Sequence, residues 1–118
     1  EEHSPRVFVP KVDYVSAPGV SDGIVRPGGP HALLTGMALF DFDKQKKRFA
    51  LRSVHHGYTA ADVREATGFD YDEPSVVPET KAPSAENLSI LRGRVTEELA
   101  ESYPAFADML RGERKEAA

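Results

Sequence analysis

The sequence predicts an α/β fold, with strands followed by helices, on three observations. Residues 31–40, HALLTGMALF, are apolar at odd and even positions alike, which is typical of a strand covered on both faces. Residues 48–54 alternate, with Phe49 and Leu51 on one face and Arg52 on the other. Residues 84–99 repeat leucine and valine at helical spacing.

The first strand is expected to continue to about Phe42. A buried helix is the alternative for residues 31–40, but Gly36 and the flanking turn residues favour a strand. A polar DKQKK turn then leads into residues 48–54, so the two strands are predicted to pair as an antiparallel hairpin.

The N-terminal third is predicted to be strand and loop. Residues 6–16 alternate in polarity around Pro10, which predicts two short strands or one kinked strand. Residues 17–30 contain four glycines and three prolines, and therefore form a loop.

Helix signals follow the hairpin. Thr59 is expected to cap a short helix with Asp62 as the capping-box partner, and Gly68 is the expected left-handed end. The proline-rich residues 72–83 are predicted to run extended over a surface.

A second helical region is predicted to begin at Ser84. Gly93 weakens this helix by about 1 kcal/mol relative to alanine. Pro104 forces a break, after which one or two further amphipathic turns are expected, and the final residues 111–118 are expected to fray.

Composition restricts the class of protein. A chain of 118 residues is one domain at most, or a piece of a larger one, and only about half of its length offers obvious core material, which suggests a partner surface. The net charge of −4 argues against nucleic-acid binding. Without cysteine there is no disulfide framework, and no apolar run approaches about 18 residues, so neither a membrane span nor a signal peptide is expected.

A glycine-rich elbow at Gly28–Gly29, followed by Pro30, is the first candidate site. Consecutive glycines let backbone N–H groups approach a phosphate or carbonyl oxygen closely. A plain flexible loop is the alternative. Neither nucleotide-binding fingerprint is present, because the sequence has no G-x-x-x-x-G-K-[ST] and no G-x-G-x-x-G.

The other titratable groups do not define a metal site or an active site. Two adjacent histidines, His55 and His56, seldom converge on one metal, and we expect their rings to bond backbone or water, with His56 as the candidate substrate contact. Asp41 and Asp43 share one side of a strand, but solvated charge beside Lys44 is the better interpretation. No nucleophile comes with a base and an orienting group, so we predict no catalytic residue and no metal ligand.

Five segments in order resemble a known family. They read FVPKVDYVSAPG, a glycine-rich loop, HALLTGMALFDFD, RFALRSVHHGYTAADVREATGF and APSAENLSILR. Together they resemble the C-terminal half of the β subunit of the glutaconate CoA-transferase family, over about residues 7–92. The strongest pieces are residues 40–43, FDFD, and residues 53–69.

The resemblance implies a fold, a ligand and partners. It implies the C-terminal part of a twisted, open α/β sheet flanked by helices, with residues 1–92 in that domain and residues 93–118 as a helical extension. Family members bind acyl-CoA between an α and a β subunit, and most use a glutamate in the N-terminal half of the β subunit as nucleophile. That half precedes the matched region, so the resemblance implies a cytoplasmic, heteromeric enzyme whose partners are an N-terminal β portion and an α subunit. The chain begins at Glu1 without methionine, which fits a cleaved or truncated β subunit.

The resemblance also suggests roles and alternatives. Arg26, Gly28 and Gly29 are expected to meet the CoA phosphates or the acyl carbonyl, with His56 as a further contact. Two departures, Gly36 in place of a common aspartate and His56 in place of the proline of His-Pro-Gly, could accompany altered chemistry. A 3-methylglutaconyl-CoA-type decarboxylase or a hydrolase of the same fold is therefore the first alternative to a transferase for short carboxylated acyl-CoA. A stand-alone, non-catalytic binding module is the second, and the enzymatic interpretation predicts exposed apolar residues such as Leu33 and Leu39.

Overall fold

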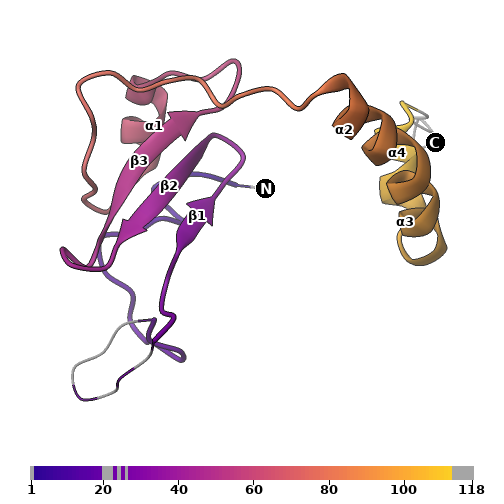
Figure 1. Ribbon diagram of the computed structural model, residues 1–118. Coiled ribbons are helices and arrows are strands. Elements are labelled where there is room, and N and C mark those ends of the chain that lie inside the picture. The colour runs from indigo at the N-terminus through magenta and orange to yellow at the C-terminus, as the bar shows by residue number, and fades with distance from the viewer. Residues whose placement is uncertain (1, 20–22, 24, 26, 113–118) are drawn as a thin grey trace. The chain divides into compact units, whose positions relative to one another are not determined.

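The computed structural model describes residues 2–19, 23, 25 and 27–112. The chain divides into two compact units, residues 1–80 and 81–118, and each is described by itself (Figure 1). The predicted division at residue 92 concerns likeness to the family and stays a prediction.

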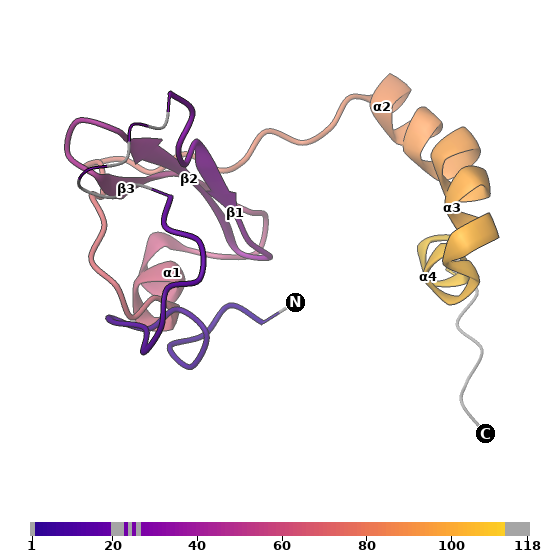
Figure 2. The same cartoon turned by 90° about the horizontal axis from the view of Figure 1, so that it is seen from below.

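The first unit is built on a three-stranded antiparallel sheet in the order β1–β2–β3. Its strands are β1 (Ala32–Leu34), β2 (Ala38–Asp43) and β3 (Arg48–Val54). The sheet is open, and one helix, α1 (Ala60–Ala66), packs beside it (Figure 1, Figure 2). The predicted α/β class is confirmed, whereas the prediction of one strand over residues 31–42 is wrong.

A tight turn divides that apolar run into two strands. The Thr35 hydroxyl oxygen accepts hydrogen bonds from the amides of Met37 and Ala38 at 3.1 and 3.0 Å. A hydroxyl that accepts from the amides two and three residues ahead stabilises a turn. Gly36, which lies between Thr35 and Met37, has no side chain that the turn must accommodate. Apolar content alone does not reveal this reversal.

The predicted hairpin between β2 and β3 is confirmed. Phe42 pairs with Phe49, and Asp43 pairs with Arg48. At the turn, the Asp43 carboxylate accepts from the amides of Gln45 and Lys46, both at 2.9 Å. This Asx-type turn explains why the polar run ends β2 where it does.

The segment after α1 runs along the outer edge of β3. Isolated parallel bridges join Ala50 to Asp72 and Val54 to Glu79, and the segment bows outward between them. The Leu51 amide donates to the Asp72 carbonyl at 2.8 Å, and the Thr80 amide donates to the Val54 carbonyl at 2.6 Å. The predicted extended path is therefore confirmed for residues 72–80, and prolines within it prevent a continuous fourth strand.

The core of this unit surrounds Phe40, which is fully buried with Val63 and Ala38. Side chains alternate along β1, so Leu33 packs against the core while Leu34 is 70% exposed. Leu33 and Leu39, the two leucines expected on an exposed apolar surface, are both half-buried.

Residues 6–16 form no strand, so that prediction is wrong too. The Ser4 carbonyl accepts from the amides of Val7 and Phe8 in a local turn, and the Phe8 carbonyl accepts from the Gly68 amide at 2.6 Å. Because β-forming residues need a partner strand, alternation alone did not suffice here.

The predicted N-terminal cap of α1 is confirmed, and the predicted left-handed C-terminal end is wrong. Thr59 and Asp62 form the reciprocal capping box. The helix ends at Thr67 in an extended conformation, and Gly68 is not left-handed. Glycine is required there for space, since a Cβ atom would collide with the Phe8 carbonyl oxygen.

The second unit consists of helical segments. They are α2 (Ala85–Ile90), η1 (Leu91–Val95), α3 (Thr96–Ser102) and α4 (Pro104–Leu110). Ser84 caps α2 through the Asn87 amide, and Pro104 begins α4, as predicted. The chain bends at Gly93, whose φ of −94° and ψ of −108° are not helical. Residues 113–118, predicted to fray, lie outside the described residues.

His3 ties three parts of the first unit together. Its Nδ1 lies 2.8 Å from the Thr35 hydroxyl, and its Nε2 lies 2.9 Å from the Thr67 hydroxyl. The Thr67 hydroxyl donates to the Val63 carbonyl at 2.7 Å, so it accepts from His3 Nε2–H. Burial lowers the pKa of His3, which agrees with a neutral ring.

Protonation of His3 should therefore destabilise the fold. Because the pKa is lower in the folded chain than the ordinary value of about 6.5, its contribution is complete above pH 6.5 and is lost as pH falls through the folded pKa. Urea unfolding at pH 7.5, 6.5 and 5.5 should show this loss, and the His3→Gln variant should show less of it. Equal pH dependence in both chains would contradict the assignment.

Gly68→Ala should destabilise the first unit, since the methyl group would force the N-terminal segment off its hydrogen bond with Gly68. We expect a loss of about 1–3 kcal/mol in unfolding free energy, the range for overpacking. Gly28→Ala is the matched control, because nothing lies within 4 Å of its added Cβ. Thermal unfolding of both variants distinguishes the contact from a general effect of losing glycine.

Candidate functional site

The glycine elbow lies exposed just before β1. Gly29 has a φ of 70°, a left-handed conformation that favours glycine, and a Cβ on Gly28 would meet only open space. The backbone is therefore accessible on this side. Arg26, the cation expected beside it, lies outside the described residues.

The two neighbouring histidines have different environments. His55 is half-buried, with Nδ1 2.8 Å from the Thr80 hydroxyl and Nε2 3.0 Å from the Thr35 carbonyl oxygen. His56 has a side chain that is 94% exposed, with Nδ1 3.2 Å from a Glu79 carboxylate oxygen. His56 is thus exposed, and its role as a ligand contact stays a prediction, while His55 fastens loops.

A short chain of hydroxyls explains how His55 is held. A carbonyl only accepts, so His55 Nε2–H donates to Thr35, while Nδ1 and the Thr80 hydroxyl share a second hydrogen bond. Thr80 in turn lies 2.7 Å from the buried Ser53 hydroxyl. This network joins β3, the β1–β2 turn and residues 79–80. Sequence reasoning did not single out Ser53 or Thr80, since nothing in their local spacing signals a contact 25 to 27 positions away.

The elbow and His56 do not form one site. Gly29 precedes β1, at the end of this strand where the Phe42 amide donates to the His31 carbonyl. His56 lies beyond the opposite end of β1, because it follows His55, which bonds Thr35 just after this strand. In Figure 1 the chain enters β1 at one end of the sheet, and β3 ends at the other. The predicted contacts can therefore only meet different parts of a ligand, or different ligands.

The paired acids have structural roles. Asp41 lies 3.3 Å from Arg52 on the neighbouring strand, and Asp43 holds the hairpin turn. This agrees with the preference for solvated charge over acid–base work.

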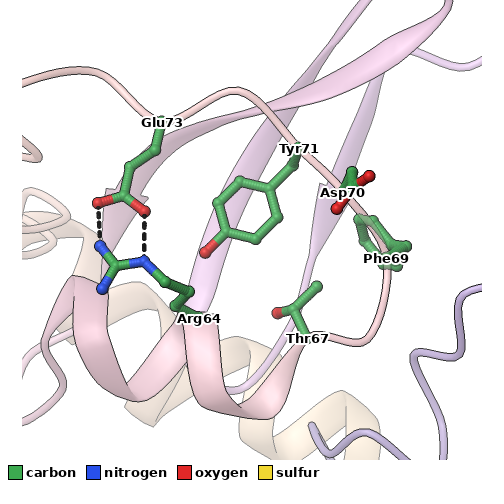
Figure 3. A pocket seen from close by; sticks show the side chains of 6 residues that line it. All are labelled: Arg64, Thr67, Phe69, Asp70, Tyr71 and Glu73. Carbon is green, nitrogen blue, oxygen red and sulfur yellow. Dashed lines mark hydrogen bonds and ion pairs between the residues drawn. The ribbon is translucent and has the colours of Figure 1, made fainter.

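A small hollow in the first unit was not predicted. It has a volume of about 260 Å³ and lies between the end of α1 and the chain that follows it (Figure 3). Its lining residues are Arg64, Thr67, Phe69, Asp70, Tyr71 and Glu73. Arg64 is held by Glu73 through two contacts of 2.6 and 3.3 Å.

The Tyr71 hydroxyl points toward Arg64 and Thr67 (Figure 3), yet it is buried and has no hydrogen-bond partner among the described residues. Burial raises the pKa of Tyr71, and the nearby Glu73 carboxylate raises it further, so the phenol stays protonated. With its cation neutralised and its hydroxyl occluded, the hollow offers structure rather than a reactive group.

No group of three or more His, Cys, Asp or Glu side chains among the described residues could hold a metal ion. No described helix is long and apolar enough to cross a membrane. Backbone amides at the elbow and an exposed imidazole can bind and orient a polar ligand.

Comparison with curated proteins identifies relatives. The chain is 33% identical over 102 residues to the β subunit of the glutaconate CoA-transferase of Acidaminococcus fermentans, and the match covers 80% of this chain and 38% of that protein. It is 31% identical over 97 residues to the cholesterol ring-cleaving hydrolase IpdB subunit of Mycobacterium tuberculosis, covering 76% and 38%. The chain thus spans about two fifths of the length of these relatives. No protein-family model matches it.

Solved structures of the same group of proteins also match this chain. Glutaconate coenzyme A-transferase from Acidaminococcus fermentans matches with a TM-score of 0.72 at 31% identity, over 84% of this chain and 41% of that one. Rhodococcus jostii IpdAB matches at 0.65 and 28% identity, over 78% and 39%. A variant of the decarboxylase AibA/AibB matches at 0.59 over 76% and 34%, and its 23% identity shows the fold alone.

Fold and comparisons define the class: an α/β chain with the fold of a CoA-transferase subunit. The family recognised from the sequence is confirmed, and the chain is a β-subunit-like segment that belongs to the glutaconate CoA-transferase family.

Replacement of the two histidines should separate their roles. His55→Ala removes two hydrogen bonds and leaves the Thr80 hydroxyl poorly satisfied, so we expect a loss of about 1–3 kcal/mol in unfolding free energy. His56→Ala should change stability by less than about 0.5 kcal/mol, as for an exposed side chain. Chemical denaturation measures both, and equal losses would overturn the distinction.

Proposed function

We propose that this chain is part of a heteromeric CoA-transferase-family enzyme that acts on a short, carboxylated, glutaconate-like acyl-CoA. The observation that carries this proposal is the 33% identity to a glutaconate CoA-transferase subunit over 80% of the chain. The structural match to the same enzyme supports it.

In this proposal the reactive group comes from a companion. The described residues hold no nucleophile activated for thioester attack, because the hydroxyl–imidazole contacts, Thr80 with His55 and both Thr35 and Thr67 with His3, are engaged in fastening loops. An N-terminal β portion would supply the nucleophile, and an α subunit would complete the site. This chain would contribute part of the sheet and ligand contacts. A cytoplasmic location stays a prediction.

The ligand contacts would lie at both ends of β1. Amides of Gly28 and Gly29, with Arg26, would meet oxygens of the CoA phosphates or the acyl group. His56, exposed at the opposite end, would meet a separate group of the ligand.

A hydrolase is the second candidate function. The 31% identity to a ring-cleaving hydrolase subunit favours it, and His56 within the His55–His56–Gly57 loop departs from the family's His-Pro-Gly. A decarboxylase is supported only by a shared fold. Covalent catalysis would distinguish the transferase, since it passes the acyl group through an enzyme-bound intermediate.

Native mass spectrometry of the protein from the organism that encodes it tests the assembly. Co-purification of an N-terminal β portion and an α subunit is expected. A lone, folded chain that binds no acyl-CoA would contradict the proposal and favour a non-catalytic module.

Gly28→Val in the assembled enzyme tests the elbow. We expect the KM for glutaconyl-CoA to rise about ten-fold, the effect of losing about 1.4 kcal/mol of binding. The melting temperature should stay unchanged, because a Cβ added at Gly28 has no described atom within 4 Å. Gly29 is a poorer choice, since its φ of 70° adds backbone strain. An unchanged KM would remove the elbow from the site.

A further inference from the structure

Residues 11–15, KVDYV, have the sequence of a strand but not its structure. Valine and tyrosine are among the residues most enriched in strands, and Pro10 and Pro18 stand where a strand can begin and end. In the structure this segment is neither helix nor strand. No backbone hydrogen bond joins it to another described residue, and none of its side chains belongs to the hydrophobic core. Its sequence preference is therefore unfulfilled in this chain.

The segment is held in place on both sides. Before it, the Phe8 carbonyl accepts from the Gly68 amide at 2.6 Å, and the centre of the Phe8 ring lies 4.6 Å from that of His3. After it, Gly19 lies against Pro30, since a Cβ on Gly19 would come within 2.6 Å of the side chain of this proline. The exposure of the residues between these points is therefore not that of a frayed terminus.

The exposed side chains of the segment would form one apolar face in a strand. Val12 and Tyr14 are 52% and 82% exposed. Because side chains alternate along a strand, these two would share one face, and Lys11, Asp13 and Val15 would lie on the other. An apolar face opposite a charged one is typical of a strand that packs one side against a core. The core that this face fits is not supplied by the described residues.

Chain order indicates which strand is the missing neighbour. Strands that are consecutive in sequence are usually neighbours in space. The next strand, β1, pairs with β2 and has no backbone hydrogen bond to residues 11–15. This leaves the strand that precedes the segment. The chain resembles the C-terminal half of the β subunit and spans about two fifths of its relatives' length, so in the proposed enzyme the preceding strand belongs to the N-terminal β portion.

We propose that residues 11–15 become a strand by pairing with a strand of the N-terminal β portion, with Val12 and Tyr14 packed against the core of that portion. Main-chain hydrogen bonds would provide the affinity, and the two apolar side chains would fix the register. The proposal rests on the proposed function, from which the companion follows, and adds the surface through which the companion binds.

Hydrogen exchange in the assembled enzyme tests the pairing. Native mass spectrometry first establishes whether an N-terminal β portion accompanies the chain. At least alternate amides within residues 11–15 should then exchange about a hundred-fold more slowly than in an unstructured peptide of the same sequence. A companion without this protection would overturn the strand and leave the proposed function intact. The absence of any companion would overturn both.

Two valine substitutions in the assembled enzyme test which face is buried. Val12→Asp and Val15→Asp place the same charge on opposite faces of the proposed strand, and the two valines are similarly exposed in this chain, 52% and 57%. Val12→Asp should raise the dissociation constant of the N-terminal β portion about a hundred-fold, because a carboxylate would be buried without a partner. Val15→Asp should change it less than about three-fold, as for a surface substitution.

Both variant chains should melt at the temperature of the unmodified chain, because each valine is exposed before assembly. Equal weakening by the two substitutions would overturn the assignment of Val12 to the buried face.

A photoreactive side chain identifies the occupant. Replacement of Tyr14 by p-benzoylphenylalanine keeps an aromatic ring on the proposed face, and irradiation of the assembled enzyme should join it to the N-terminal β portion. The same replacement at Val15, on the opposite face, should give much less of this product. A crosslink from the Tyr14 position to an α subunit or to a second copy of this chain would overturn the proposal.

Discussion

The burial of Phe40 is the contact on which the first unit depends. Its ring meets Tyr71 edge-on with ring centres 5.2 Å apart, and Phe49, Phe69 and His3 lie around it at 6.4 Å. These rings come from β2, β3, the segment after α1 and the N-terminal residues. Losing a ring at such a position costs about 3–5 kcal/mol, a large share of what a small domain has. Val54, just before the His55 loop, and Tyr71, which lines the hollow, both belong to or pack against this core.

The polar contacts around that core hold loops rather than carry out chemistry. Thr35 shows this most clearly. Its hydroxyl forms the turn that ends β1 and bonds His3, and its carbonyl accepts from His55. A histidine hydrogen-bonded at both nitrogens has no free lone pair for a substrate proton. The exposed His56 and the bare backbone at Gly28 are different, because the His56 side chain is 94% exposed and a Cβ added at Gly28 would have no described atom within 4 Å.

The two units solve the problem of a small core in different ways. Aromatic side chains fill the first, whose sheet provides a surface on which they can converge. The second has helices with an apolar repeat but no covering layer, so its leucines remain half exposed. Each unit is small, which limits how much apolar surface it can bury by itself.

The sequence by itself determined the local features of this protein and its family. The capping box at Thr59, the β2–β3 hairpin, the helix start at Ser84 and the break at Pro104 were predictable because each depends on residues within a few positions. The tertiary structure alone decided that Gly68 makes room for Phe8, that His55 rather than His56 is fastened, and that Leu34 rather than Leu33 faces outward. It also placed the elbow and His56 beyond opposite ends of β1. These outcomes depend on contacts between residues far apart in the chain, and local spacing carries no record of such contacts.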